Sequence, residues 1–391
     1  MTLPPMWKVR RELRAGFAKL SMLFMRTVHD PIRKVIYDRR SNRLIKITPG
    51  ELTLTDRVAV FVVFQPNGLA PSLQLTLDHL ARNRFSVVLV SNGPLRPDDR
   101  TAVAKSVSVL LERPNVGYDF GGYRDGIRYL WSLRHELSLL VLMNDSTWFP
   151  LRRDDDSLAR MEALGADLAG HVFKTENEKR PDNDHIESHM LMISKDFVRS
   201  SDFRQFWSRY VMSNSRVTTI RVGEKAFTQC AIRSGWRVGS ILDRQWLMSV
   251  LQKLDDADLE LVLQHTIDIK HHRHPDLSTV RRCLASGEPW REAFLAWTDH
   301  SLRNSRPILL SAAFVMPAHV YGRMGFAKKA KDMRFHMARE ELLDLEASGM
   351  IPPLADEVRA EVSQMVRGWV PPNGQARVTR PRIAQQQRVI Q

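Results

Sequence analysis

The feature that most constrains the fold is the stretch from Glu112 to Leu151, where a glycine-rich loop, an amphipathic helix and a short apolar strand follow one another. Apolar side chains from Tyr123 to Trp131 recur at the three- and four-residue spacing of a helix. The run Leu139–Met143 is too short for a helix and apolar on both faces, which indicates a strand inside a parallel sheet. Ligands of such sheets bind beyond the carboxyl ends of the strands, where Asn144 and Asp145 follow.

The residues before this stretch repeat the alternation of strands and helices. Buried strands are predicted at Val58–Phe64, Ser86–Ser91 and Val107–Leu111, with helices at Leu73–Leu80 and Asp98–Lys105 between them. This alternation predicts an α/β fold, in which a doubly wound, mostly parallel sheet carries helices on both faces. Helical extensions are predicted at both ends of the chain.

Two common nucleotide-binding motifs are missing from the sequence. The glycines at 117, 121, 122 and 126 do not form the G-x-G-x-x-G dinucleotide fingerprint, and no phosphate loop ending in Gly-Lys-Ser/Thr occurs. A nucleotide-sugar site needs neither motif, so this kind of site is compatible with the predicted sheet.

The pair Asn144-Asp145 suits the chemistry of such a site. A nucleoside diphosphate leaving group is offset by Mg²⁺ or Mn²⁺, which takes one or two carboxylates plus phosphate and water oxygens. The alternative is an Asn-Asp turn that satisfies its own backbone. A second acidic run, Asp154-Asp155-Asp156, contains Asp-x-Asp, but an apolar helical pattern follows it. We interpret this run as a helix start, where the helix dipole favours negative charge.

The loop from Asn115 to Tyr123 has two interpretations. Glycines followed by a helix N-terminus can receive a phosphate group, with Arg124 or Arg113 as its partner. The alternative is a tight turn between a strand and a helix.

Two motifs carry a family resemblance: Asn115-Val116-Gly117-Tyr118-Asp119-Phe120-Gly121-Gly122-Tyr123 and Asn144-Asp145-Ser146. They resemble the Asn-x-Gly loop and the short acidic motif of the rhamnan synthesis protein F family, and behind it the GT-A glycosyltransferases. The resemblance covers roughly residues 57–295 and implies a GT-A-like fold. It implies a donor site formed by Asn92, Asn115, Gly117, Asp119, Arg124, Asn144 and Asp145, with Asn144 and Asp145 holding a divalent cation.

The resemblance also implies a catalytic base and a further metal ligand. Glu224 is predicted to open a helix that ends at Gly235, and in related transferases an acidic residue there deprotonates the acceptor hydroxyl. An ordinary helix-start glutamate is the alternative. In many GT-A enzymes a late histidine completes the metal shell, which assigns His274, although a solvated basic loop explains it equally well. His189 stands where the family pattern differs, and we interpret it as structural.

Basic charge is concentrated near the N-terminus of a chain whose net charge is +14. Residues 1–50 carry many Lys and Arg, with apolar residues at helical spacing between them. Such a helix can lie on an anionic membrane, or it can pack on the body with a solvated basic face. A basic surplus also suits nucleic acid, but no recognition motif for it occurs, so we do not expect nucleic acid as a partner.

The sequence predicts four regions: a basic amphipathic extension at 1–50, a GT-A-like domain at 57–295, a helical region at 296–360, and a disordered basic tail at 361–391. With only Cys230 and Cys283, a disulfide framework is not expected, and a reducing cytoplasm is. A polar stretch, Lys174–Ile186, is predicted as a loop over the site.

The predicted function is glycosyl transfer at the inner face of the cytoplasmic membrane. The resemblance implies that the protein moves a sugar, rhamnose or another deoxyhexose, from a nucleotide-diphosphate donor to a cell-surface polysaccharide or a lipid-linked glycan. The alternative is a catalytically inactive protein of the same fold that acts as a scaffold in polysaccharide assembly.

Overall fold

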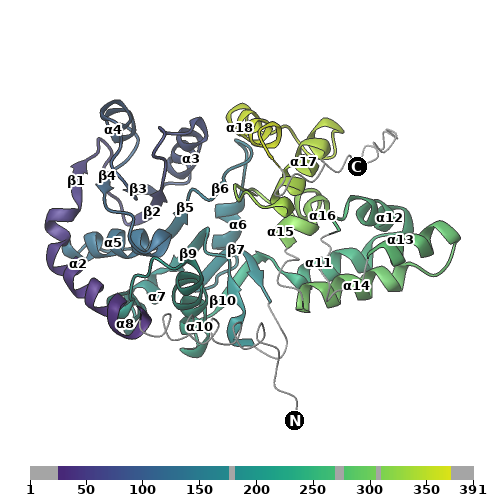
Figure 1. The fold of residues 1–391 in the computed structure, drawn as a ribbon, viewed down its shortest axis with the longest axis horizontal. Coiled ribbons are helices and arrows are strands. Elements are labelled where there is room, and N and C mark those ends of the chain that lie inside the picture. Colours follow the sequence, from purple (N-terminus) through teal and green to yellow (C-terminus); the bar gives the residue numbers. More distant parts are fainter. Residues whose placement is uncertain (1–24, 176–180, 269–276, 305–309, 371–391) are drawn as a thin grey trace, which may run out of the picture.

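A computed structural model describes residues 25–175, 181–268, 277–304 and 310–370 (Figure 1). Predictions for 1–24, for His274 and for most of the C-terminal tail lie outside these residues. Within the described ranges, no helix is both apolar enough and long enough to span a bilayer.

The centre of the protein is one large sheet with strand order β1-β4-β3-β2-β5-β9-β7-β10, in which β8 pairs with β7. β4, β3, β2 and β5 are mutually parallel, as are β7 and β10, whereas β9 runs antiparallel to both its neighbours and β1 antiparallel to β4. The predicted mostly parallel α/β sheet is therefore confirmed. The strands are β1 (Lys46–Pro49), β2 (Arg57–Val63), β3 (Ser86–Ser91), β4 (Val109–Glu112), β5 (Leu139–Asn144), β7 (Leu168–Lys174), β8 (His185–Ile186), β9 (Met190–Ser194) and β10 (Val238–Leu242).

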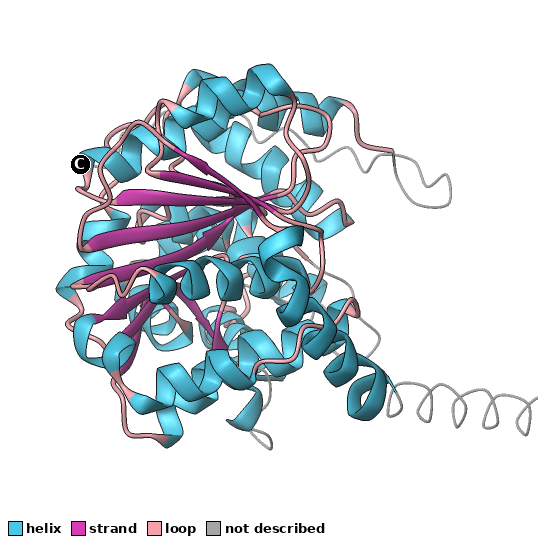
Figure 2. Cartoon of the chain, turned by 90° about the vertical axis from the view of Figure 1, so that its left-hand side faces the viewer, coloured by secondary structure: helices cyan, strands magenta, loops and turns pink. Residues whose placement is uncertain are grey.

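Alternate residues of the central strands build two separate cores. In β2, Val58, Val60 and Val62 enter one core, while Phe61 and Val63 enter the other, because successive strand side chains point to opposite faces. Figure 2 shows helices on both sides of the sheet. The first core is covered by α5 (Tyr118–Ser132), α7 (Lys195–Arg199), α8 (Ser201–Arg209) and α10 (Ala226–Arg233), and the second by α3 (Pro71–Arg82), α6 (Ser157–Ala163) and the C-terminal helices. The short helix α4 (Pro97–Ala104) precedes β4.

Gly121, Gly122 and Gly126 lie inside α5, which begins at Tyr118, earlier than predicted, and Gly117 is its N-cap residue. A Cβ atom added at Gly122 would lie 2.7 Å from a methyl carbon of Val62, and one added at Gly126 would lie 2.4 Å from Val60. These glycines therefore allow the helix to pack directly on β2.

The C-terminal helices are α11 (Arg244–Lys253), α12 (Asp256–His265), α13 (Leu277–Ser286), α14 (Arg291–Asn304), α15 (Leu310–Ala313), α16 (Val315–Val320), α17 (Met333–Ala347) and α18 (Asp356–Arg367). Between α16 and α17, β11 (Ala327–Lys328) pairs with β6 (Thr147–Trp148), directly after Asp145. The predicted boundary at residue 295 falls within α14, and the predicted N-terminal extension contains β1, which joins the sheet edge.

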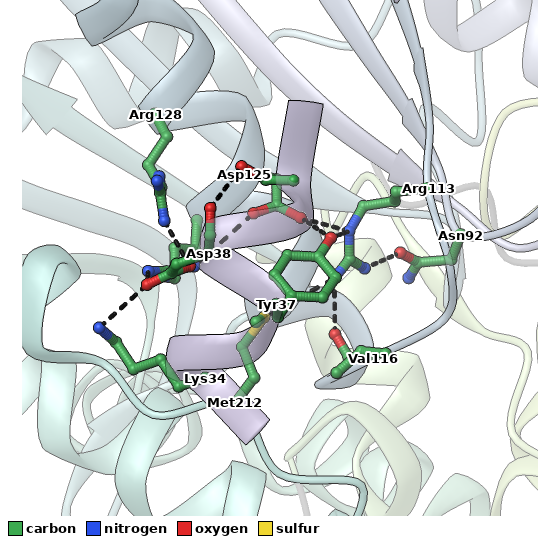
Figure 3. A network of polar contacts seen from close by, with 11 residues as sticks. Lys34, Tyr37, Asp38, Asn92, Arg113, Val116, Asp125, Arg128 and Met212 are labelled. Carbon is green, nitrogen blue, oxygen red and sulfur yellow. Dashed lines mark hydrogen bonds and ion pairs between the residues drawn. The ribbon is translucent and has the colours of Figure 1, made fainter. Parts of the chain in front are cut away.

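The helix α2 (Asp30–Leu44) lies along the outside of α5 and is joined to it by buried polar contacts (Figure 3). The Tyr37 hydroxyl donates to Asp125 Oδ2 at 2.5 Å, and Arg113 Nε donates to the same oxygen at 2.6 Å. Arg113 also donates to Asn92 Oδ1 and to the carbonyl of Val116. We call these contacts the α2–α5 network.

Replacing Asp125 by Ala should destabilise the protein strongly. The Arg113–Asp125 ion pair is almost completely buried, so removal of the carboxylate leaves an uncompensated charge, which costs about 3–5 kcal/mol in the free energy of unfolding. Urea unfolding measures this loss. Asp182→Ala, which removes a solvent-exposed partner of Arg233, should leave the midpoint unchanged. Equal midpoints for the two variants would contradict the structural role of the network.

Candidate active site at the carboxyl edge of the sheet

The site is centred on Asp145, at the carboxyl end of β5. The chain proceeds from β2 through β3 to β4 on one side, whereas β5 pairs with β2 on the other side, so the sheet has a topological switch point between β2 and β5. The Asp145 carboxylate is fixed there by two donors: Oδ2 accepts from the Phe64 backbone N–H at 3.0 Å and from Gln65 Nε2 at 3.1 Å. The Asp145 side chain is partly exposed.

Asn144 is buried and holds a neighbouring carboxylate. Its amide donates to Asp119 Oδ2 at 3.0 Å and lies 3.1 Å from the Tyr123 hydroxyl, while its Oδ1 accepts from the Ser146 N–H. The sequence placed Asn144 in the metal shell. In the structure, the Asn144 side chain forms hydrogen bonds with Asp119 and Tyr123 of α5 and with the following turn. These contacts fit a role in positioning Asp119 better than a role as a metal ligand.

Asp119 lies close enough to two other carboxylates to be affected by both. Its pKa is raised to about 7, first by burial and then by the negative charges of Asp145 and Glu224, while the positive charges of Lys328 and Arg216 oppose the shift. Asp119, Asp145 and Glu224 therefore share one electrostatic environment. They come from the start of α5, the end of β5 and a helix that follows β9.

The prediction that Glu224 opens a helix is wrong, because the turn before it is also helical. Glu224 lies within the π-helix η3 (Ile220–Lys225), between α9 (Arg216–Thr219) and α10. The side chain is mostly buried, and Oε1 accepts from the Ser188 backbone N–H at 2.9 Å. Gly223 lets this turn approach α5, since a Cβ there would lie 2.7 Å from the Phe120 ring.

Two lysines that the sequence did not assign reach the site from the C-terminal region. Lys328 Nζ lies 2.9 Å from Glu187 Oε2 and 3.1 Å from His189 Nδ1, and its charge acts on Asp119. The backbone N–H of Lys329 donates to the Ser146 carbonyl at 2.8 Å. Burial lowers the pKa of Lys329, and the nearby Asp145 carboxylate opposes this shift. No local signal could have found these lysines, because the β11–β6 pairing brings them here from far along the chain.

Other predicted donor residues are held elsewhere by protein contacts. Arg124 donates to Asp38 of α2 at 2.8 Å, so its guanidinium has a structural partner in place of the predicted phosphate. Asn92 is buried between Arg113 and the Tyr118 carbonyl. Gly117 has a φ of 81°, a left-handed backbone conformation that favours glycine at this position. Asn115 is exposed.

The acidic run at 154–156 is a helix start, as interpreted from the sequence. α6 begins at Ser157, and Asp155 Oδ1 accepts from the Ser157 N–H at 2.9 Å. This run is therefore not part of the carboxylate cluster.

The described residues offer few candidate ligands for a metal ion. Among them, no three His, Cys, Asp or Glu side chains converge as a metal site. Asp145 fits as a single protein ligand, since it is partly exposed and its described hydrogen bonds all go to Oδ2. Such a site suits a cation whose other ligands are phosphate oxygens and waters.

Asp119 should make stability depend on pH. Its folded-state pKa of about 7 lies above the ordinary value of 3.8, so its contribution is fully present below the unfolded-state pKa and is lost as the pH rises through about 7. Asp119→Asn removes this titration. The stability of the variant relative to the wild type, measured by urea unfolding, should therefore rise from about pH 4 to about pH 8. A constant difference across this range would contradict the raised pKa.

Comparisons with known proteins agree with the motifs. A curated protein of Sinorhizobium fredii, the uncharacterised protein y4gN, is 32% identical over 235 residues, which are 60% of this chain. The match spans 61% of the length of that relative.

Two solved structures match this chain at low similarity. One, from Desulfovibrio desulfuricans G20, is assigned as a nucleotide-diphospho-sugar transferase; it is 13% identical, with a TM-score of 0.32, and the match covers 59% of this chain and 96% of that one. The other is the mannosyltransferase PcManGT of Pyrobaculum calidifontis, in complex with GDP-Man and Mn²⁺; it is 13% identical, with a TM-score of 0.31, and the match covers 88% and 89%. The fold class therefore rests on the sheet topology described above.

The family comparison covers the part of the chain that carries the three carboxylates of the site. Residues 87–256 contain β4, α5, β5 and Glu224, and with them Asp119 and Asp145. Over these residues the chain matches the family described as rhamnan synthesis protein F, which confirms the resemblance seen in its motifs.

Proposed function

We propose that this protein is a glycosyltransferase that takes a nucleotide-sugar donor at the carboxyl edge of β2 and β5. The observation that carries this proposal is the grouping of Asp119, Asp145 and Glu224 at the topological switch point. Open α/β sheets bind their ligands at this position. The match to the rhamnan synthesis protein F family supports the reaction class.

Each charged residue has a role that follows from its surroundings. Asp145 holds a Mg²⁺ or Mn²⁺ ion, and that ion offsets the charge of the donor diphosphate. Lys329, buried next to the Asp145 charge, supplies a second positive charge toward the phosphates. Asp119 is oriented by Asn144 and shapes the donor side of the site.

Glu224 is the base if the reaction inverts the anomeric centre. Its Oε1 is fixed by the Ser188 N–H, which leaves Oε2 as the oxygen that accepts the proton of the acceptor hydroxyl. That proton moves to the glutamate as the sugar oxygen attacks the anomeric carbon and the diphosphate leaves.

We propose the finer assignments on the family resemblance alone. The donor sugar is rhamnose or another deoxyhexose, and the acceptor is a surface polysaccharide or a lipid-linked glycan at the cytoplasmic face of the membrane. Purified full-length protein should release nucleoside diphosphate from one member of a panel of nucleotide sugars, in the presence of Mg²⁺ or Mn²⁺. Failure to release it from any member, with or without lipid-linked acceptors, would contradict the proposal.

Lys329→Met should weaken binding of the free nucleoside diphosphate about tenfold or more, because a hydrogen bond to a charged group contributes about 1.5–3 kcal/mol. Isothermal titration calorimetry with Mn²⁺ present measures this change. Lys331→Met, which neutralises an exposed lysine two residues away, is the matched control and should bind like the wild type. Equal affinity of the two variants would exclude Lys329 from the phosphate site.

The second candidate is a scaffold that keeps the fold without the chemistry. The engagement of Asn144 and Arg124 with protein partners favours it. Calorimetry separates the two candidates, since a scaffold without chemistry has no need to bind nucleoside diphosphate or Mn²⁺.

A further inference from the structure

The helix α2 has an inner and an outer face of different chemistry. Tyr37 and Asp38 point from the inner face toward α5, where they contact Asp125, Arg124 and Arg128 (Figure 3). The outer face carries a row of exposed aliphatic side chains, with exposed fractions between 41% and 54%: Ile32, Val35 and Ile36 of α2, and Val28 of the π-helical turn η1 (Met25–His29) that leads into it.

The outer face also carries only positive charge. Exposed arginines stand on the same side of the helix at 39, 40 and 43, and Lys46 follows at the start of β1. The two acidic residues of α2 are both turned inward. Asp38 is bound by Lys34, Arg124 and Arg128, and Asp30 is buried beside His29. We call the residues Val28, Ile32, Val35, Ile36, Arg39, Arg40 and Arg43 the α2 outer face.

We propose that the α2 outer face docks on an anionic lipid bilayer. A helix lying in the membrane interface buries its aliphatic side chains at the headgroup–acyl boundary and places its Lys and Arg near the headgroups. The exposed aliphatic row meets the first requirement, and the acid-free set of arginines meets the second. A nucleic acid would engage the arginines through its phosphates but would leave the aliphatic row in water.

Because α2 is fixed to the sheet, docking through its outer face sets the position of the candidate active site relative to the bilayer. Figure 1 shows α2 at the end of the molecule opposite the C-terminal helices α12, α13 and α14. The α2–α5 network joins the helix rigidly to Asn92, Arg113 and Val116, just ahead of the loop that leads to Asp119. A bilayer that holds the outer face therefore holds the whole sheet, and fixes the distance of the carboxylate cluster from the lipid surface.

Vesicle co-sedimentation of the full-length protein tests this proposal without reference to any enzyme activity. We expect binding to vesicles of phosphatidylcholine with phosphatidylglycerol, and little binding to phosphatidylcholine alone. Arg39→Gln/Arg43→Gln should weaken binding to the anionic vesicles about 25-fold, since each basic residue near the headgroups contributes about fivefold. Ile32→Ser/Ile36→Ser removes apolar area without changing charge and should weaken binding at high salt as well as at low salt.

The controls lie on other elements. Leu164→Ser/Ile232→Ser removes exposed aliphatic residues after α6 and in α10, and should leave vesicle binding unchanged. Circular dichroism confirms that each variant is folded. The proposal is overturned if the wild type does not sediment with anionic vesicles, or if both α2 variants bind like the wild type, which would assign the binding to another segment. Binding of duplex DNA in place of vesicles would also overturn it.

Discussion

Replacing Glu224 by Gln should lower the rate of sugar transfer by about 10²–10⁴-fold, the usual contribution of a general base. The glutamine can still accept the Ser188 N–H through its carbonyl oxygen, so the turn around η3 keeps its shape. It cannot accept the proton of the acceptor hydroxyl. The kcat measured at saturating donor and acceptor should fall, while the KM for the donor changes little, because the proposed position of the donor diphosphate is on the Asp145 side of the site.

A matched control separates the catalytic role of Glu224 from a structural one. Glu260→Gln makes the same chemical change at a partly exposed glutamate of α12, whose described contact is a surface hydrogen bond accepted from Gln264. Its kcat should equal that of the wild type. Wild-type kcat in Glu224→Gln would instead mean that another group takes the proton, or that the reaction retains the anomeric configuration.

Replacing Asp145 by Asn should lower kcat/KM by about 10²–10³-fold, because the carboxylate that is proposed to hold the cation beside the departing diphosphate is lost. The asparagine oxygen can still accept from the Phe64 N–H and from Gln65, so the end of β5 stays in place. Metal dependence should weaken together with activity. Steady-state kinetics over a Mn²⁺ titration measures both effects.

The acidic run after β6 offers a close control for Asp145. Asp154 is exposed and belongs to the literal Asp-x-Asp at 154–156, yet it lies beside a helix start. Asp154→Asn should therefore keep wild-type kinetics. Loss of activity in Asp154→Asn with full activity in Asp145→Asn would move the cation to that run.

The sheet and the position of Asp145 could be predicted from the sequence because their signals are local. An apolar run such as Leu139–Met143 predicts a buried strand, and β3 has the predicted bounds Ser86–Ser91. The residue after a parallel strand must lie at the carboxyl edge, so the place of Asp145 followed from strand direction alone.

The remaining features of the site depend on contacts between distant segments. The sequence does not show that Asn144 would turn to Asp119, or that Arg124 would meet Asp38 across the α2–α5 interface. Lys329 reaches the site only because β11 pairs with β6. Glu224 was placed at a helix start because a π-helical turn has no sequence signal of its own.

The central claim is that the carboxyl edge between β2 and β5 binds a nucleoside diphosphate through Asp145. Isothermal titration calorimetry of the full-length protein with the free nucleoside diphosphates tests it most directly. We expect one of them to bind only when Mg²⁺ or Mn²⁺ is present, and we expect Asp145→Asn to lose this binding while Asp154→Asn retains it. Metal-independent binding, or equal affinity in wild type and Asp145→Asn, would contradict the claim.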